Sequence, residues 1–211
     1  MKITIVYDNT TFRKDLQADW GFSAFVETGD RKILFDTGAN GSILLSNMEQ
    51  LGIAPKDVED VFISHDHFDH TGGLSAFLDR NPEVTVWVPH SFRGVKGAKK
   101  VVEVDRAQKL DEGIYSTGEL DGIEQSLCLE TPKGIFIVAG CSHPPLKQII
   151  GAASQFGRVY GILGGLHGNG PEFLKDLDLI CATHCTQAKE EIKALYPDQW
   201  IEGGAGKVVE I

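Results

Sequence analysis

Long apolar runs and blocks of basic residues are both missing from this 211-residue sequence. The N-terminal segment 1–8 is apolar for too short a distance to be a signal peptide or a membrane span. The net charge is −10, with 20 basic against 30 acidic residues. A partner with a phosphate backbone requires clustered cations, and these are confined here to the short stretch 93–100. We therefore expect a cytoplasmic protein that binds neither nucleic acid nor a membrane.

Repeats, low-complexity tracts and linkers are missing as well. A chain of 211 residues with 42% hydrophobic and 24% charged residues has ordinary globular composition, and it can form one domain with a sizeable core. We predict a single domain over residues 1–211, with no room for a second large module. The oligomeric state stays open, although a homodimer is the commonest closed assembly.

Cysteine is scarce, with four residues at Cys128, Cys141, Cys181 and Cys185. In an intracellular chain they are expected to be free thiols rather than disulfides. Cys141 lies two residues before His143, and Cys185 directly follows His184. A thiolate ligand or a redox role therefore stands beside the simpler role of small apolar packing.

Histidine, by contrast, is concentrated: the stretch 64–73, Ser-His-Asp-His-Phe-Asp-His-Thr-Gly-Gly, contains three of the seven. His65 and His67 share one face of an extended backbone, so both imidazoles can bind one cation. Asp69 and His70 come as the chain turns, and they can serve a second cation about 3.5–4 Å away. We interpret the stretch as a metal site of the zinc type. A polar loop of solvated histidines is the alternative.

Three further histidine loops follow apolar runs. They are Gly140-Cys141-Ser142-His143, Gly164-Gly165-Leu166-His167 and Thr183-His184-Cys185-Thr186. We expect each to lie at the carboxyl end of a strand, as the stretch 64–73 does.

Apolar periodicity predicts the elements around these loops. Strands are expected at 3–7, 22–27, 32–35, 61–64, 84–88, 101–104, 114–117, 125–130, 135–139, 159–163, 177–183 and 208–211, and helices at 42–51, 74–78, 144–156 and 188–195. The first hairpin turns at residues 28–31, and the strands between 101 and 139 are expected to form a second sheet. Thr186 is the candidate N-cap of the last helix.

The histidine stretch resembles the signature of the metallo-β-lactamase superfamily. The turn Phe35-Asp36-Thr37-Gly38 is similar to the Asp-Thr-Gly turn of that superfamily, and the three later histidine loops are similar to its later ligand loops. The resemblance implies an α/β (α+β) fold, a four-layer αββα sandwich with the metals at one edge between two sheets. It also implies hydrolytic chemistry in most members. Two zinc ions are expected, although such sites also take iron, manganese or nickel.

The resemblance further implies a ligand set. One metal would be held by His65, His67 and His143, and the other by Asp69, His70 and His184, with Asp36 supporting the loop from behind. The superfamily usually adds a bridging aspartate at the end of a later strand, where this chain has His167 and no carboxylate. Three roles for His167 are open: metal ligand, catalytic or substrate contact, and structural residue. Without the bridge, two divalent ions with Asp69 and a hydroxide carry roughly +2, which favours an anionic substrate.

The three later loops together resemble one archaeal and bacterial branch, often named after the synthesis of a dihydropterin-linked ribofuranosylaminobenzene phosphate. Our leading hypothesis is a metal-dependent hydrolase in which a metal-bound hydroxide attacks a small anionic substrate, a phosphate ester or cyclic phosphate. Asp69 and His167 are its candidate catalytic residues. A pterin-pathway transferase and a non-catalytic metal-binding domain are the alternatives.

Overall fold

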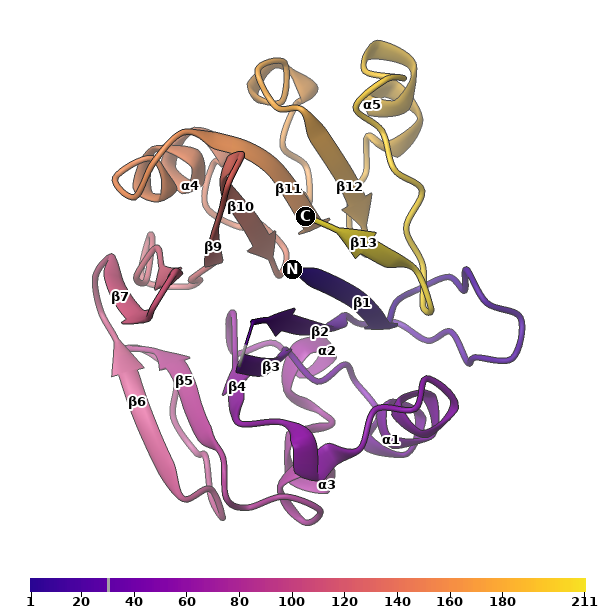
Figure 1. The fold of residues 1–211 in the computed structure, drawn as a ribbon, viewed down its shortest axis with the longest axis vertical. Coiled ribbons are helices and arrows are strands. Elements are labelled where there is room, and N and C mark those ends of the chain that lie inside the picture. Colours follow the sequence, from indigo (N-terminus) through magenta and orange to yellow (C-terminus); the bar gives the residue numbers. More distant parts are fainter. Residues whose placement is uncertain (30) are drawn as a thin grey trace.

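Two sheets form the centre of the computed structural model, which describes residues 1–29 and 31–211 (Figure 1). The seven-stranded sheet has the order β13 (Val208–Glu210), β1 (Lys2–Tyr7), β2 (Ser23–Thr28), β3 (Arg31–Phe35), β4 (Asp60–Phe62), β5 (Thr85–Pro89), β6 (Lys100–Val104). The six-stranded sheet has the order β12 (Leu179–Thr183), β11 (Val159–Gly165), β10 (Gly134–Ala139), β9 (Leu127–Thr131), β8 (Ile114–Ser116), β7 (Gln108–Asp111). Asp30, in the expected hairpin turn, lies outside the described residues.

Helices cover the outer faces of the two sheets (Figure 1). The seven-stranded sheet packs against α1 (Gly41–Gln50) and α3 (Leu74–Leu78), and the six-stranded sheet packs against α4 (Leu146–Ala153) and α5 (Lys189–Leu195). The short α2 (Phe68–Thr71) and the 3-10 turns η1 (Pro55–Asp57) and η2 (Pro171–Phe173) lie in the connections. None of the helices described is long and apolar enough to cross a membrane. The four-layer αββα sandwich is the predicted fold and is confirmed.

Strands in the middle of each sheet bury both faces. In β2, Val26 packs between the sheets while its neighbour Phe25 packs under the helices. In β10, Phe136 and Val138 face the other sheet, and Ile137 faces α4. Successive side chains of a strand point to opposite faces. A strand covered on both sides is therefore apolar at nearly every position, which is why these runs were visible in the sequence.

Parallel strands bring the histidine loops to the strand ends. In the first sheet β3, β4 and β5 are parallel neighbours, and residues 63–70 follow the end of β4. In the second sheet β10, β11 and β12 are parallel, and each ends at one of the three later histidine loops. The predicted order of strand and then histidine loop is confirmed at all four places.

The edge strands correct the sequence interpretation. β6, expected in the second sheet, pairs in parallel with β5 at the edge of the first. It is exposed along most of its length, as is usual for a charged edge strand. Its apolar residues therefore could not indicate which of the two sheets it joins. β7 was missed because its four residues, Gln-Lys-Leu-Asp, are mostly polar. It is held by antiparallel pairing with β8 rather than by burial.

Gly164 is a position where the fold tolerates no side chain. Its φ is +130°, and a Cβ there would lie 1.9 Å from the carbonyl oxygen of Ala139 on β10. We expect Gly164→Ala to lower the free energy of unfolding by about 3 kcal/mol or more, since both backbone strain and a backbone clash act. Gly52→Ala is the matched control, because Gly52 also has a positive φ of +71° but nothing within 4 Å of a Cβ. It should cost about 1 kcal/mol. Equal losses in urea denaturation would contradict the steric account.

Candidate metal centre

The first group of possible ligands joins the two sheets. His65 and His67 extend from the loop after β4, and His143 extends from the loop after β10. Their ligand atoms lie within 4.8 Å of one another, and Nε2 of His65 is 3.0 Å from Nδ1 of His67. Two imidazole nitrogens on one tetrahedral zinc lie about 3.3 Å apart, given Zn–N distances near 2.0–2.1 Å. The three histidines could therefore hold one metal ion.

The second group lies beside the first and is entirely buried. It consists of Asp69, His70 and His184, whose ligand atoms also lie within 4.8 Å of one another. Oδ2 of Asp69 is 3.3 Å from Nε2 of His184 and 3.8 Å from Nε2 of His70. The rings of His65 and His70 have centroids 4.2 Å apart, so the two groups are neighbours.

Asp36 orients the second group from behind. Its fully buried carboxylate accepts a 2.7 Å hydrogen bond from Nδ1 of His70, and it also accepts bonds from the Ser64 backbone N–H (2.7 Å) and the Ser64 hydroxyl (2.6 Å). Nδ1 of His70 must carry the proton to donate to a carboxylate. In the neutral ring, Nε2 of His70 then has the lone pair that faces the site, the usual arrangement behind a metal-binding histidine.

His184 is oriented by a residue of the N-terminal loop. Oδ1 of Asn9 accepts from the Gly21 N–H at 3.1 Å and lies 3.0 Å from Nδ1 of His184. The Gly21 bond fixes the amide orientation, so Nδ1 of His184 is the donor, and in the neutral ring Nε2 carries the lone pair. Asp8, in turn, accepts from the His184 backbone N–H at 2.8 Å. The N-terminal loop therefore reaches the site through Asp8 and Asn9.

A bare ring nitrogen and a carboxylate face each other as a result. Within residues 1–29 and 31–211, Nε2 of His143 and Nε2 of His184 are buried and lack a hydrogen-bond partner. In the neutral ring Nε2 of His184 is an acceptor, 3.3 Å from the carboxylate oxygen Oδ2 of Asp69, and two buried acceptors this close need a proton or a metal cation between them. The donor set of imidazole and carboxylate therefore fits a divalent metal.

Burial lowers the pKa values of histidines in the first group and so keeps their rings neutral. Burial, and then the neighbouring imidazoles His67 and His167, lowers the pKa of His143 to about 4. Burial and the surrounding histidines also lower the pKa of His65 far below its usual value. Both rings are neutral at pH 7, and the neutral imidazole is the form that binds a metal.

Glu124 is a functional residue that the sequence interpretation missed. It is buried, and its two carboxylate oxygens accept the backbone N–H groups of Cys141, Ser142 and His143 at 2.8–3.0 Å. Burial raises the pKa of this carboxyl group, although the three N–H bonds oppose the effect. Glu124 thus fixes the loop that carries His143. It follows a turn without a periodic pattern, so nothing in the sequence marked it.

His167 lies next to the first group but belongs to none of the ligand groups in the described part of the chain. Its ring centroid is 4.9 Å from that of His143, and its side chain is half-buried.

Two thiols belong to further ligand groups. Cys141 is grouped with His65 and His70, and Cys141 is grouped again with His184 and Cys185. All four cysteines are free.

Thr186 is not the N-cap of α5, which is Ala188 without a side-chain bond. Its hydroxyl accepts from the Leu166 N–H at 2.9 Å and donates to the Thr183 carbonyl at 2.8 Å. The residue therefore ties the His167 loop to the His184 loop, and the prediction of a cap was wrong because this tertiary bond competes for the same oxygen.

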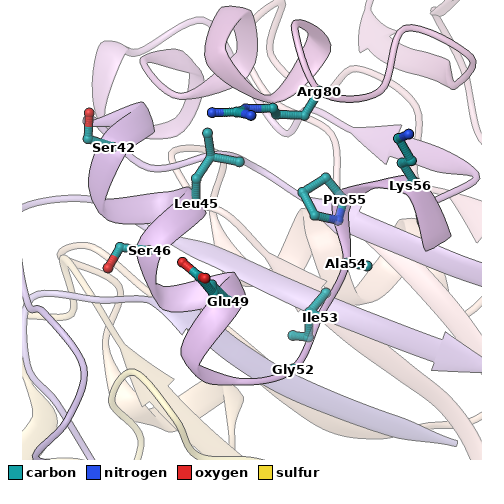
Figure 2. A pocket seen from close by; sticks show the side chains of 10 residues that line it. All are labelled: Ser42, Leu45, Ser46, Glu49, Gly52, Ile53, Ala54, Pro55, Lys56 and Arg80. Carbon is teal, nitrogen blue, oxygen red and sulfur yellow. The ribbon is translucent and has the colours of Figure 1, made fainter.

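A surface hollow of about 870 Å³ shares no lining residue with this cluster, and Figure 2 shows its lining side chains. Its lining comes from α1, the segment after it and one arginine: Ser42, Leu45, Ser46, Glu49, Gly52, Ile53, Ala54, Pro55, Lys56 and Arg80. No histidine or cysteine lines it. Its size alone does not make it a site for metal chemistry, and the histidine cluster is the better candidate.

Comparisons with known proteins agree with this geometry. A model of the metallo-beta-lactamase superfamily matches residues 21–127. A relative in Methanocaldococcus jannaschii, named 7,8-dihydropterin-6-methyl-4-(beta-D-ribofuranosyl)-aminobenzene-5'-phosphate synthase, is 26% identical over 98% of this chain and 95% of its own. A solved metal-dependent hydrolase of the beta-lactamase superfamily has a TM-score of 0.80 at 22% identity, covering 100% of this chain and 99% of its own. YhfI from Bacillus subtilis, a metallo-beta-lactamase fold protein, has a TM-score of 0.74 at 12% identity with the same coverage.

Replacing Asp36 tests the orientation of His70. Asp36→Asn keeps the shape but removes the charged acceptor of Nδ1, so we expect zinc affinity to fall about 10- to 100-fold. The measurement is competition with a fluorescent zinc chelator. Asp60→Asn is the matched control, since Asp60 is also buried but bonds Trp87, away from the histidines. Equal zinc affinity in wild type and Asp36→Asn would contradict the assignment.

Proposed function

Because the chain belongs to the metallo-β-lactamase superfamily, whose members are usually hydrolytic, we propose that it is a metal-dependent hydrolase acting on a small anionic substrate, a phosphate ester or cyclic phosphate. The observation that carries the proposal is the pair of adjacent ligand groups, each with three nitrogen or oxygen donors. His65, His67 and His143 would hold one divalent ion, and Asp69, His70 and His184 the other. Zinc suits the imidazole-rich set, and iron, manganese or nickel also fit.

Bound divalent ions would polarise the scissile bond and bring the pKa of water toward about 7. The protein's own groups would manage the protons. Asp69 is a carboxylate at the centre of the site and can accept a hydrogen bond from the attacking water. His167 lies on the half-exposed side, beside His143 but outside both groups, where its imidazole can donate a proton to the leaving oxygen. Of its three open roles, we favour the catalytic contact.

The charge of the site supports the choice of substrate. Two divalent ions are opposed by Asp69 alone among the carboxylates of the ligand groups described. Other buried carboxylates nearby, those of Asp8, Asp36 and Glu124, accept from protein donors. A site with excess positive charge binds an anion better than a neutral lactone. Trp20 is 53% exposed and its ring centroid is 5.1 Å from that of His184, so it offers an aromatic surface to the organic part of the substrate.

A pterin-pathway transferase is the second candidate, because the relative that matches 98% of this chain is named a synthase. In that reaction the same cations would stabilise a pyrophosphate leaving group while a pterin carbon is attacked. Phosphate or pyrophosphate release that requires a pterin would favour it. Hydrolysis of a simple phosphodiester without a pterin favours the hydrolase.

The reaction class is tested with bis(p-nitrophenyl) phosphate, a cyclic nucleotide and a homoserine lactone as parallel substrates. We expect the zinc-loaded protein to hydrolyse at least one phosphodiester with kcat/KM at least about tenfold above that for the lactone, because the site is cationic. Chelator treatment should abolish turnover, and added zinc should restore it. Full metal occupancy without turnover of any ester would favour a non-catalytic metal-binding domain instead.

Replacing His167 separates its roles. We expect His167→Gln to retain the wild-type metal content and to lower kcat about 10²-fold or more, since it removes a proton donor. The readouts are elemental analysis and steady-state kinetics on the best phosphodiester. His90→Gln, which removes an exposed histidine paired with Glu103, is the control and should change neither. Loss of one ion would make His167 a ligand, and an unchanged rate would make it structural.

A further inference from the structure

The end of β11 cannot supply a carboxylate to the metals. It reads Gly164-Gly165, and a Cβ on Gly165 would lie 2.5 Å from the carbonyl oxygen of Gly140 and 2.7 Å from Sγ of Cys185. Together with the clash at Gly164, this leaves no space for an aspartate there. Sγ of Cys185 occupies the space beside Gly165 instead, and Cα of Cys141 lies 3.2 Å from the same position.

Cys141 lies where the two ligand groups meet. Its Sγ is 3.2 Å from Nε2 of His70, the ring nitrogen that does not bond Asp36. Sγ also lies within 4.8 Å of the ligand atoms of His65 and His70, and within 4.8 Å of those of His184 and Cys185. Among the described residues, Cys141 and His70 each belong to one group with His65 and to another with His184, and Cys141 is the one of the two that neither ligand set has claimed.

We propose that the Cys141 thiolate is a ligand shared between the two candidate metal positions, in place of a bridging carboxylate. The inference rests on the metal site proposed above. A nitrogen and a sulfur on one tetrahedral zinc lie about 3.6 Å apart, given Zn–N near 2.0–2.1 Å and Zn–S near 2.3 Å. The 3.2 Å between Nε2 of His70 and Sγ of Cys141 needs only a small adjustment to reach that spacing.

The backbone around Cys141 is fixed in a way that suits a ligand. Glu124 accepts its N–H at 2.9 Å, and the next residue, Ser142, is held at a φ of +58° with its hydroxyl bonded to the Gly165 carbonyl at 2.7 Å. Cys141 itself is only 4% exposed. The left-handed conformation of Ser142 and the burial of the Glu124 carboxylate both cost free energy. Costs of this kind are concentrated at functional sites, which supports a functional role for the loop that they position.

Cys185 lies beside Cys141 and is not the shared ligand in this proposal. Its Sγ is 3.7 Å from the carbonyl oxygen of Cys141, and it shares a ligand group only with Cys141 and His184. Cys185 is grouped with a residue of the second set but with none of the first. We therefore assign it to hydrogen bonding and packing beside Cys141.

A thiolate ligand changes the charge and the metal preference. It lowers the formal charge of the site by one unit, from roughly +2 to roughly +1, so the site still favours an anion. Thiolate is a soft ligand that selects zinc or iron and disfavours magnesium and calcium. Metal binding would also release the thiol proton and protect the sulfur from alkylation.

The test is spectroscopic and uses the full chain, purified under reducing conditions and loaded with Co²⁺. We expect a near-ultraviolet sulfur-to-cobalt charge-transfer band in the wild type, in Cys185→Ser and in Cys128→Ser, which removes a buried thiol of β9 that belongs to none of the ligand groups described. The band should be lost in Cys141→Ser. X-ray absorption of the zinc-loaded wild type should show a Zn–S distance near 2.3 Å, a readout that does not depend on any variant folding.

The failures of the two proposals can be told apart. Two bound ions without a sulfur neighbour, or a band that persists in Cys141→Ser, would overturn the assignment of Cys141 and leave the hydrolase proposal standing. A band lost only in Cys185→Ser would overturn it as well, by moving the ligand to the other thiol. A protein that binds neither cobalt nor zinc would contradict both proposals.

Discussion

The hydrogen bonds of the buried Asp36 carboxylate are the interactions on which the site depends. They connect the end of β3 to the residue that opens the metal loop and to the ring of His70. A buried carboxylate is costly unless donors satisfy it, so these three bonds fix both the loop and the tautomer of His70 together. Asn9 acts in the same way on His184. Each metal-facing nitrogen of the second group is thus left bare by a bond on the far side of its ring.

The fold explains why these supports converge from distant parts of the chain. Three parallel strands of one sheet and one strand of the other end at the same edge, so residues as far apart as Asn9 and His184 meet there. The loops are held in costly conformations, with Asp36, Ser142, His167 and His184 all at positive φ. Such strain is maintained by the packed core and the buried bonds around it.

The sequence predicted the elements whose signal is local. Buried strands, α1 and α3 follow from apolar periodicity. The pairs His65 with His67 and Asp69 with His70 follow from the dense histidine pattern after such a strand, whereas the resemblance added His143 and His184. It could not place β6 or β7, because pairing at a sheet edge leaves no apolar pattern. It could not find Glu124 either, because the role of Glu124 depends on backbone N–H groups that lie 17 to 19 positions later in the chain. The Thr186 prediction failed for the same reason, since its partner Leu166 comes from another strand end. The thiols were visible, but only the structure brings Cys141 between the two groups.

In the proposed site, buried acceptors orient the histidines that would hold two adjacent cations, and these cations would act on an anion. The most direct test of this site is the number of metal ions per chain, measured by elemental analysis while zinc is titrated into the metal-free protein and phosphodiester hydrolysis is followed. The account predicts saturation near two ions per chain, with full activity only after the second has bound. Saturation at one ion with full activity would contradict the dinuclear site.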